Sequence, residues 1–209
     1  MAITLQDVNI IKNVMNSLVD RLGVIQILQP ELLPYGWRKA AKGRTVWRLL
    51  EEIIVQNLMC NPQNYGLVRA DPPCSEVGVW DLKLTHPQIS YPIYINIKSA
   101  TSGNKNSKDD ISKAIGLHDF FTQNIEASLC IVTFNLKFLP VMQVKILDVF
   151  VMPVTWLPDI YVNPSNNGNL QSSHYKDIDL RIMRSNNQFL SELNFAINIA
   201  NQKKLRKEV

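Results

Sequence analysis

Residues 91–100 read YPIYINIKSA, an apolar stretch that ends with an asparagine and a lysine two positions apart. Alternate side chains of a β-strand point to the same face of the sheet. The three isoleucines of this stretch therefore share one face, while Tyr94, Asn96 and Lys98 share the other. A core strand does not need a lysine on either face, so the face that carries Lys98 is a candidate functional site.

Strands and a helix are predicted on either side of this stretch. Before it, GLVRA and the alternating VGVWDLKL indicate β-structure, and His86-Pro87 indicates a turn. After it, the loop TSGNKNSKDD is polar, and Ser107 with Asp110 resembles a capping box for a helix over about 110–123. The remaining elements are expected as strands near 128–138 and 144–154, a polar loop over 158–180, and a helix over about 186–204.

The N-terminal part is expected to be helical. Thr4 is a candidate N-cap, apolar residues recur at helical spacing from Val8 to Leu18, and Gly23 is a stop signal. A second helix is expected over about 44–58. This order of helices and strands predicts an α/β fold with a mixed sheet. We expect one domain, 1–209, made of an N-terminal helical segment (1–42), a core (43–154), and a polar loop with the C-terminal helix (155–209).

The composition is that of an ordinary globular protein, with 46% hydrophobic residues, 19% charged residues and a net charge of +4. The positive charge is compatible with a nucleic-acid partner but does not require one. The three cysteines form no CxxC pair, which argues against a zinc finger or a disulfide framework and indicates a reducing compartment. Because no apolar run reaches the length of a membrane span and no signal-peptide pattern is visible, we expect a cytoplasmic protein without a membrane partner.

Polar residues recur at defined positions in the two central strands and in the helix before them. Asp81 ends GVWD, Asn96 follows fifteen residues later, and Lys98 lies two beyond it. In the upstream helix GRTVWRLLEEIIVQNL, Glu51 falls on an apolar face and Glu52 on a polar face. A carboxylate on an inward face needs a partner, so we favour Glu51 for the site, although the two glutamates could exchange roles.

This pattern resembles the signature of the PD-(D/E)XK nucleases, a family that includes many type II restriction endonucleases. Asp81 and Lys98 match its first and last positions, whereas Trp80 replaces the usual proline and Asn96 stands where the family has Asp or Glu. The resemblance covers about residues 43–125. It implies a restriction-endonuclease-like α/β fold, in which helices flank a mixed β-sheet, and a single nuclease domain with its catalytic core in 43–154.

The resemblance also implies an activity, which is the Mg²⁺-dependent, site-specific hydrolysis of phosphodiester bonds in double-stranded DNA. The metal would be held by Asp81, Glu51, the Asn96 side chain and the backbone carbonyl of Ile97, because Mg²⁺ prefers oxygen ligands. Lys98 would orient or help to deprotonate the attacking water and stabilise developing charge. Such enzymes usually act as homodimers that read palindromic sites, and the first and last helices are candidate dimer surfaces.

Asn96 leaves alternatives open. An amide oxygen binds a cation without contributing negative charge, so weaker metal binding and weaker activity are expected. The asparagine fits either a natural variation or an Asp→Asn change that traps uncleaved DNA. The chain could also be another nuclease of this fold, such as a resolvase or a repair enzyme, or a DNA-binding module that has lost catalysis. A function without nucleic acid is the remaining alternative.

Three polar segments are candidate DNA contacts, and each also fits a solvated loop. They are KAAKGR before the second helix, TSGNKNSK directly after the central strand, and the amide-rich NPSNNGNLQSSHYK over 163–176. The contact residues expected in the first two segments are Lys42, Arg44, Asn104, Lys105, Asn106 and Lys108.

Structural roles compete with the functional ones. Lys98 could simply reach water from a strand end, and Asp81 could be a turn or edge-strand residue. Asp71 is expected in a turn because two prolines follow it, and Glu76 is a weaker alternative ligand. The histidines that are expected to be structural are His86 and His118.

Overall fold

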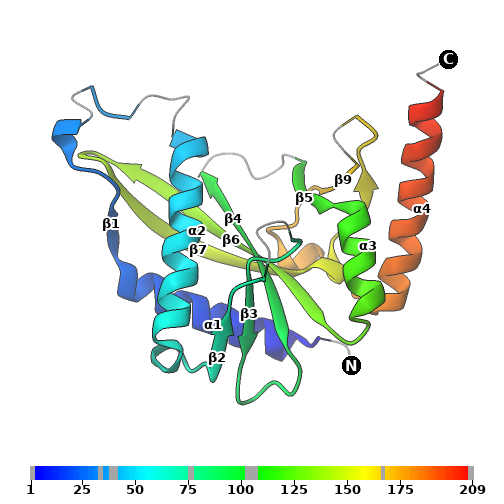
Figure 1. Ribbon diagram of the computed structural model, residues 1–209, viewed down its shortest axis with the longest axis horizontal. Coiled ribbons are helices and arrows are strands. Elements are labelled where there is room, and N and C mark those ends of the chain that lie inside the picture. The colour runs from blue at the N-terminus through cyan, green and yellow to red at the C-terminus, as the bar shows by residue number, and fades with distance from the viewer. Residues whose placement is uncertain are drawn as a thin grey trace.

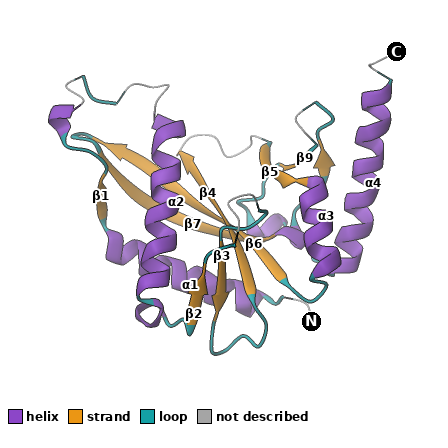
Figure 2. Cartoon of the chain, in the orientation of Figure 1, coloured by secondary structure: helices purple, strands orange, loops and turns teal. Residues whose placement is uncertain are grey.

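The computed structural model describes residues 3–32, 35–37, 42–74, 78–101, 108–165 and 168–206, with the backbone alone at 42–45. Figure 1 shows these residues by chain position and Figure 2 by element type. The α-helices are α1 (Leu5–Leu22), α2 (Lys42–Cys60), α3 (Ala114–Gln123) and α4 (Asn186–Leu205). The strands are β1 (Val24–Gln26), β2 (Arg69–Asp71), β3 (Leu82–Thr85), β4 (Ile93–Thr101), β5 (Asp109–Lys113), β6 (Ser128–Leu139), β7 (Gln143–Pro153), β8 (Tyr161–Val162) and β9 (Asn169–Ser172).

Six strands form one sheet in the order β1-β7-β6-β4-β3-β2, and β5-β9-β8 form a smaller sheet. The strands β4 and β6 pair in parallel, whereas the other neighbouring strands are antiparallel. A parallel pair requires a crossover connection, and β5 with α3 supplies it between β4 and β6. The predicted α/β fold with a mixed sheet is therefore confirmed.

The strand β4 separates an apolar face from a polar face, as its sequence predicts. Its three isoleucines are at most 4% exposed, and the alternate side chains from Tyr94 to Lys98 are partly buried. On the apolar face α2 packs against the strand, where Ile54 and Ile97 border the same narrow void. On the other face the rings of Tyr94 and Phe120 of α3 meet edge to face at 5.0 Å between centroids. Figure 1 shows α2 and α3 to either side of β4.

Local capping signals place the ends of α1 correctly. The Thr4 hydroxyl accepts the N–H of Asp7, and the Asp7 carboxylate accepts the N–H of Thr4 at 2.8 Å, which closes the predicted cap of α1. Gly23 follows the helix with φ of 59°, a conformation that glycine adopts without strain. In the described part of the chain, no helix combines the length and the apolarity that crossing a membrane requires.

Two predictions around the smaller sheet are wrong. The helix expected over 110–123 begins only at Ala114, because residues 109–113 form β5 and pair with β9. Ser107, the other half of the expected capping box, lies outside the described residues. The segment 158–180, expected to be a polar loop, contains β8 and β9, which are too short to show a periodic pattern.

Candidate active site

Asp81 is fixed to β4 by both its backbone and its side chain. Its N–H donates to the carbonyl of Ile95 at 2.7 Å, and its Oδ2 accepts the N–H of Ile97 at 2.6 Å. Asp81 directly precedes β3, whose first residue, Leu82, pairs with Ile95. The carboxylate therefore lies where β3 begins beside the middle of β4, with one of its oxygens held by the backbone of that strand.

Asn96 lies on the polar face of β4, next to the residue that holds Asp81. Its Nδ2 donates to the carbonyl of Val79 at 2.9 Å. Its Oδ1 is buried and has no hydrogen-bond partner among the described residues. The position at which the resembled family carries an acid is thus occupied by an amide whose nitrogen is bonded and whose oxygen is not.

Glu51 extends from α2 toward Asp81, and both side chains border a cleft of about 370 Å³. The Oε2 of Glu51 is buried and has no hydrogen-bond partner within the described part of the chain. Glu52 also borders the cleft, but it is exposed and accepts a hydrogen bond from Gln56 at 2.6 Å. The helix therefore directs Glu51, and not Glu52, to Asp81.

Lys98 completes this group. It borders, with Glu51, the narrow void between α2 and β4. Its ammonium group is attracted most strongly by the carboxylate of Asp81, then by Asp110 and Asp109, and also by Glu51. The structure thus brings Glu51, Asp81 and Lys98 together, and Asn96 directly precedes Ile97, whose N–H holds Asp81. We refer to Glu51, Asp81, Asn96 and Lys98 as the carboxylate–lysine group.

Burial destabilises the charged forms within this group. Burial and repulsion from Asp81 raise the pKa of Glu51 to about 7, against the attraction of Arg48 and Lys98. Burial also raises the pKa of Asp81, although the N–H of Ile97 and the charge of Lys98 act in the opposite direction. The pKa of Lys98 is lowered by burial, against the attraction of Asp81. A cation bound between the two carboxylates would offset their desolvation and their mutual repulsion.

The oxygen atoms of the carboxylate–lysine group fit a hard divalent cation. Mg²⁺ prefers oxygen ligands and is commonly held by one or two carboxylates together with waters and phosphate oxygens. The two buried oxygens without partners, Glu51 Oε2 and Asn96 Oδ1, are atoms that such a cation would satisfy. Among the described residues, no three His, Cys, Asp or Glu side chains gather to hold a metal. The roles of the Asn96 side chain and of the Ile97 carbonyl as ligands stay predictions.

Arg48 is a further candidate that the sequence pattern does not single out. It borders the cleft beside Glu51 and Asp81, and its charge acts on both carboxylates. Its guanidinium lies 4.6 Å from the centroid of the Trp47 ring, and the side chain is exposed. An exposed arginine beside the cleft is suited to a phosphate group. Its position three residues before Glu51 places both side chains on the same side of the helix, and this spacing would identify Arg48 from the sequence.

The expected DNA contacts are described only in part. Lys42 and Arg44 fall in the first turn of α2, where the backbone alone is described. The Nζ of Lys108 stands 4.1 Å from the centroid of the Tyr161 ring. These three contacts stay predictions, as do those that lie outside the described residues, namely Asn104, Lys105 and Asn106.

In the described part of the segment 163–176, the amide side chains of Asn163, Asn169 and Gln171 are bonded within the protein. Asn169 and Gln171 of β9 donate to the carboxylate of Asp110 at 3.2 and 2.6 Å. The amide nitrogens of Asn169 and Gln171 support the pairing of β9 with β5. They are therefore less available to contact DNA bases than the amides of a solvated loop would be.

Other singled-out residues lie apart from the carboxylate–lysine group. Asp71 ends β2 and accepts a hydrogen bond from Arg69 at 2.6 Å, so the expected turn is wrong because β2 pairs with β3 as far as this residue. The Nδ1 of His86 accepts the N–H of Gln88 at 3.2 Å, as in a structural turn. His118 contacts the neighbouring Asp119 at 3.2 Å, and Glu76 lies outside the described residues.

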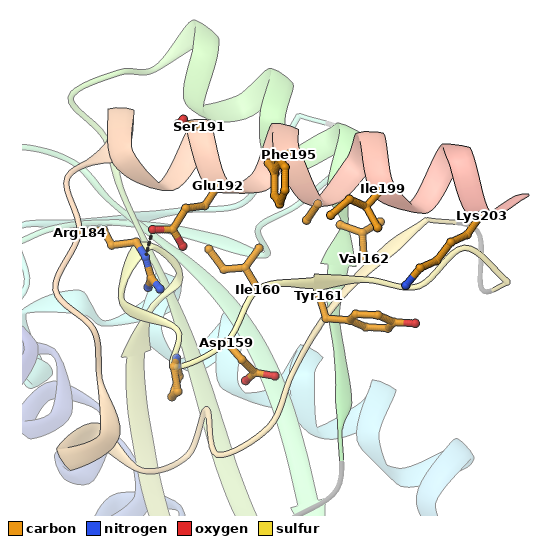
Figure 3. A pocket seen from close by; sticks show the side chains of 12 residues that line it. Asp159, Ile160, Tyr161, Val162, Arg184, Ser191, Glu192, Phe195, Ile199 and Lys203 are labelled. Carbon is orange, nitrogen blue, oxygen red and sulfur yellow. Dashed lines mark hydrogen bonds and ion pairs between the residues drawn. The ribbon is translucent and has the colours of Figure 1, made fainter.

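A larger hollow, of about 630 Å³, lies between α4 and the segment 158–162. Figure 3 shows Phe195 and Ile199 of α4 facing Ile160 and Val162 across it. The ion pair of Arg184 with Glu192, at 2.8 Å, stands at one end. None of the residues that line it borders the cleft at Glu51, so the two hollows are separate features.

Neither a scan against protein-family models nor a search of curated proteins found a match to this chain.

Proposed function

We propose that this chain is a nuclease with a restriction-endonuclease-like fold that cleaves double-stranded DNA at specific sites, as a type II restriction endonuclease does. The observation that carries the proposal is the convergence of Glu51, Asp81 and Lys98, in which the buried Oε2 of Glu51 lacks a partner in the described part of the chain. The resemblance of the Asp81, Asn96 and Lys98 pattern to the nuclease signature supports the same conclusion.

Hydrolysis of a phosphodiester needs charge neutralisation and an activated water. A bound Mg²⁺ supplies both, since it neutralises phosphate charge and lowers the pKa of its water. In this chain Asp81 would present a carboxylate whose position is fixed by the N–H of Ile97, with Glu51 and the Asn96 oxygen beside it. The Lys98 ammonium would orient the attacking water and stabilise the charge that develops on the phosphate.

A catalytically impaired DNA-binding module is a second candidate, and the neutral Asn96 favours it. Replacing a carboxylate by an amide removes one negative charge from the cation site, which weakens metal binding. A repair or resolving nuclease of the same fold is the third. Cleavage into discrete fragments separates restriction from the other nucleases, and binding without cleavage separates the module from both.

We further propose that the chain forms a homodimer and that α4 provides the interface. Phe195 on this helix is 69% exposed and faces the larger hollow. The hollow is bordered by two acidic and two basic side chains, Asp159, Glu192, Arg184 and Lys203. A two-fold interface places one patch against its own copy, and a patch with equal numbers of both charges is compatible with that pairing.

The proposal is tested by digesting plasmid and phage DNA with the chain in Mg²⁺ or Mn²⁺, beside a Lys98→Ala variant. We expect discrete fragments from the parent chain. In the variant, cleavage should fall by roughly a hundredfold or more, as for other residues that assist proton transfer or stabilise charge. Uncut DNA with both cations, from a chain that nevertheless retards DNA in a gel at low salt, would favour the binding module.

A further inference from the structure

Asn96 makes a hydrogen bond that an acidic residue could not make. Its Nδ2 donates to the Val79 carbonyl at 2.9 Å. An ionised carboxylate is acceptor-only, so aspartate at this position would set one of its oxygens against the carbonyl oxygen. The site is therefore built around an amide at 96, although the resembled family carries an acid there.

The segment that receives this bond is packed against its surroundings. A Cβ on Gly116 of α3 would lie 3.0 Å from the Val79 side chain, so the segment approaches the helix closely. The Trp80 ring meets the Tyr94 ring edge to face at 5.1 Å between centroids. These contacts hold residues 78–81 in place, and the Asn96 amide adds the bond that links Val79 to β4.

We propose that Asn96 is a positioning residue whose amide nitrogen ties the segment 78–81, and with it Asp81, to β4. This role is argued from the hydrogen bond to Val79 and does not rest on the proposed function. The asparagine is then the residue for which this site is shaped, and not the replacement of a catalytic acid.

The positioning role is tested on the metal-free protein by thermal unfolding in EDTA at pH 7.5. Asn96→Asp should lower the unfolding midpoint by about 5–10 °C, because it loses the bond and leaves a further carboxylate beside Val79 and Asp81. Asn96→Ala should lower the midpoint by less, since it adds no charge. Asn57 supplies the matched control, because its Nδ2 donates to the Ile53 carbonyl at 2.8 Å. Asn57→Asp should lower the unfolding midpoint by at most about 3 °C.

A midpoint for Asn96→Asp equal to that of the parent, or above it, overturns the positioning role, since the site then accepts an acid. The effect on Asp81 is read from the rise in the unfolding midpoint that millimolar Mg²⁺ or Ca²⁺ produces, because a displaced Asp81 weakens cation binding whereas a lost structural bond elsewhere does not. We expect a rise in the parent chain and in Asn57→Asp, and at least a halving of it in Asn96→Ala. A rise of equal size in the parent and in Asn96→Ala overturns the positioning of Asp81. No rise in the parent removes the cation site and the proposed function with it, while the EDTA result still decides whether Asn96 ties the segment 78–81 to β4.

Discussion

Glu51 differs from an ordinary surface glutamate because burial and repulsion from Asp81 raise its pKa to about 7. A carboxylate whose pKa is raised by folding contributes stability below its unfolded-state pKa, and that contribution is lost as the pH rises through the folded-state pKa. The free energy of unfolding of the metal-free protein should therefore contain a term that declines between pH 4.5 and about 7.

Glu51→Gln should remove this term. The decline is expected to be on the order of 1 kcal/mol, because solvent screening at a half-exposed side chain reduces the full linkage value. Urea unfolding in EDTA at several pH values from 4.5 to 7.5 measures it, with Glu52→Gln as the control that retains the parent profile. Parallel profiles for the parent and Glu51→Gln would contradict the burial of a titrating carboxylate at this position.

Sequence and structure agree unevenly at the residue scale. Strand alternation alone places Lys98 on one face with Asn96, whereas the choice of Asp81 as its partner follows from the resemblance to the nuclease signature. Glu51 could be separated from Glu52 because a helix turns by a fixed angle per residue. The bond from Asn96 to the Val79 carbonyl could not be predicted, since it depends on the path of an irregular segment that no periodic pattern describes.

Among the elements, α3 sets the position of the segment before β3. Gly116→Ala would place a methyl group 3.0 Å from the Val79 side chain, so Val79 must give way by a few tenths of an ångström. Alanine is the better helix former by up to about 1 kcal/mol, so α3 itself should not be weakened. We therefore expect DNA cleavage and cation-induced stabilisation to fall several-fold while the protein remains folded.

The measurements are digestion, the Mg²⁺-dependent rise in the unfolding midpoint, and circular dichroism. Ile115→Ala is the control, because Ile115 lies beside the glycine on α3 and is 66% exposed. Full activity in Gly116→Ala, or an equal loss in Ile115→Ala, would show that the packing of α3 on Val79 does not position the site.

Elements defined by local signals could be predicted, and those defined by distant pairing could not. The caps Thr4 and Gly23 bound α1, and the apolar runs of β6 and β7 are long enough to be unambiguous. The strand β5 escapes prediction because its partners are remote. Asp109 pairs with Lys176, 67 positions away, and Asp110 is bonded by Gln171. The local sequence predicts a helix start at these aspartates, but the long-range contacts of β5 override that preference.

In the whole molecule, the proposed homodimer is tested at α4, where Phe195 is 69% exposed and lines the larger hollow. If two copies associate there, Phe195→Ser should weaken the dimer roughly tenfold or more, since a buried aromatic anchor is typical of interface hot spots. Sedimentation velocity over a range of protein concentrations measures this. Asn194→Ala is the control, because Asn194 is exposed on the same helix and does not line the hollow. A parent chain that sediments as a monomer throughout would contradict the dimer.

The central claim is that the carboxylate–lysine group cleaves DNA, and the pair of glutamates on α2 tests it most directly. Glu51→Gln and Glu52→Gln are the same substitution at neighbouring positions, and only Glu51 carries a buried oxygen without a partner among the described residues. In a digestion of phage DNA with Mg²⁺, we predict discrete fragments from the parent and from Glu52→Gln, and a loss of about a hundredfold in Glu51→Gln. Equal cleavage by both variants, or loss in Glu52→Gln alone, would contradict the account.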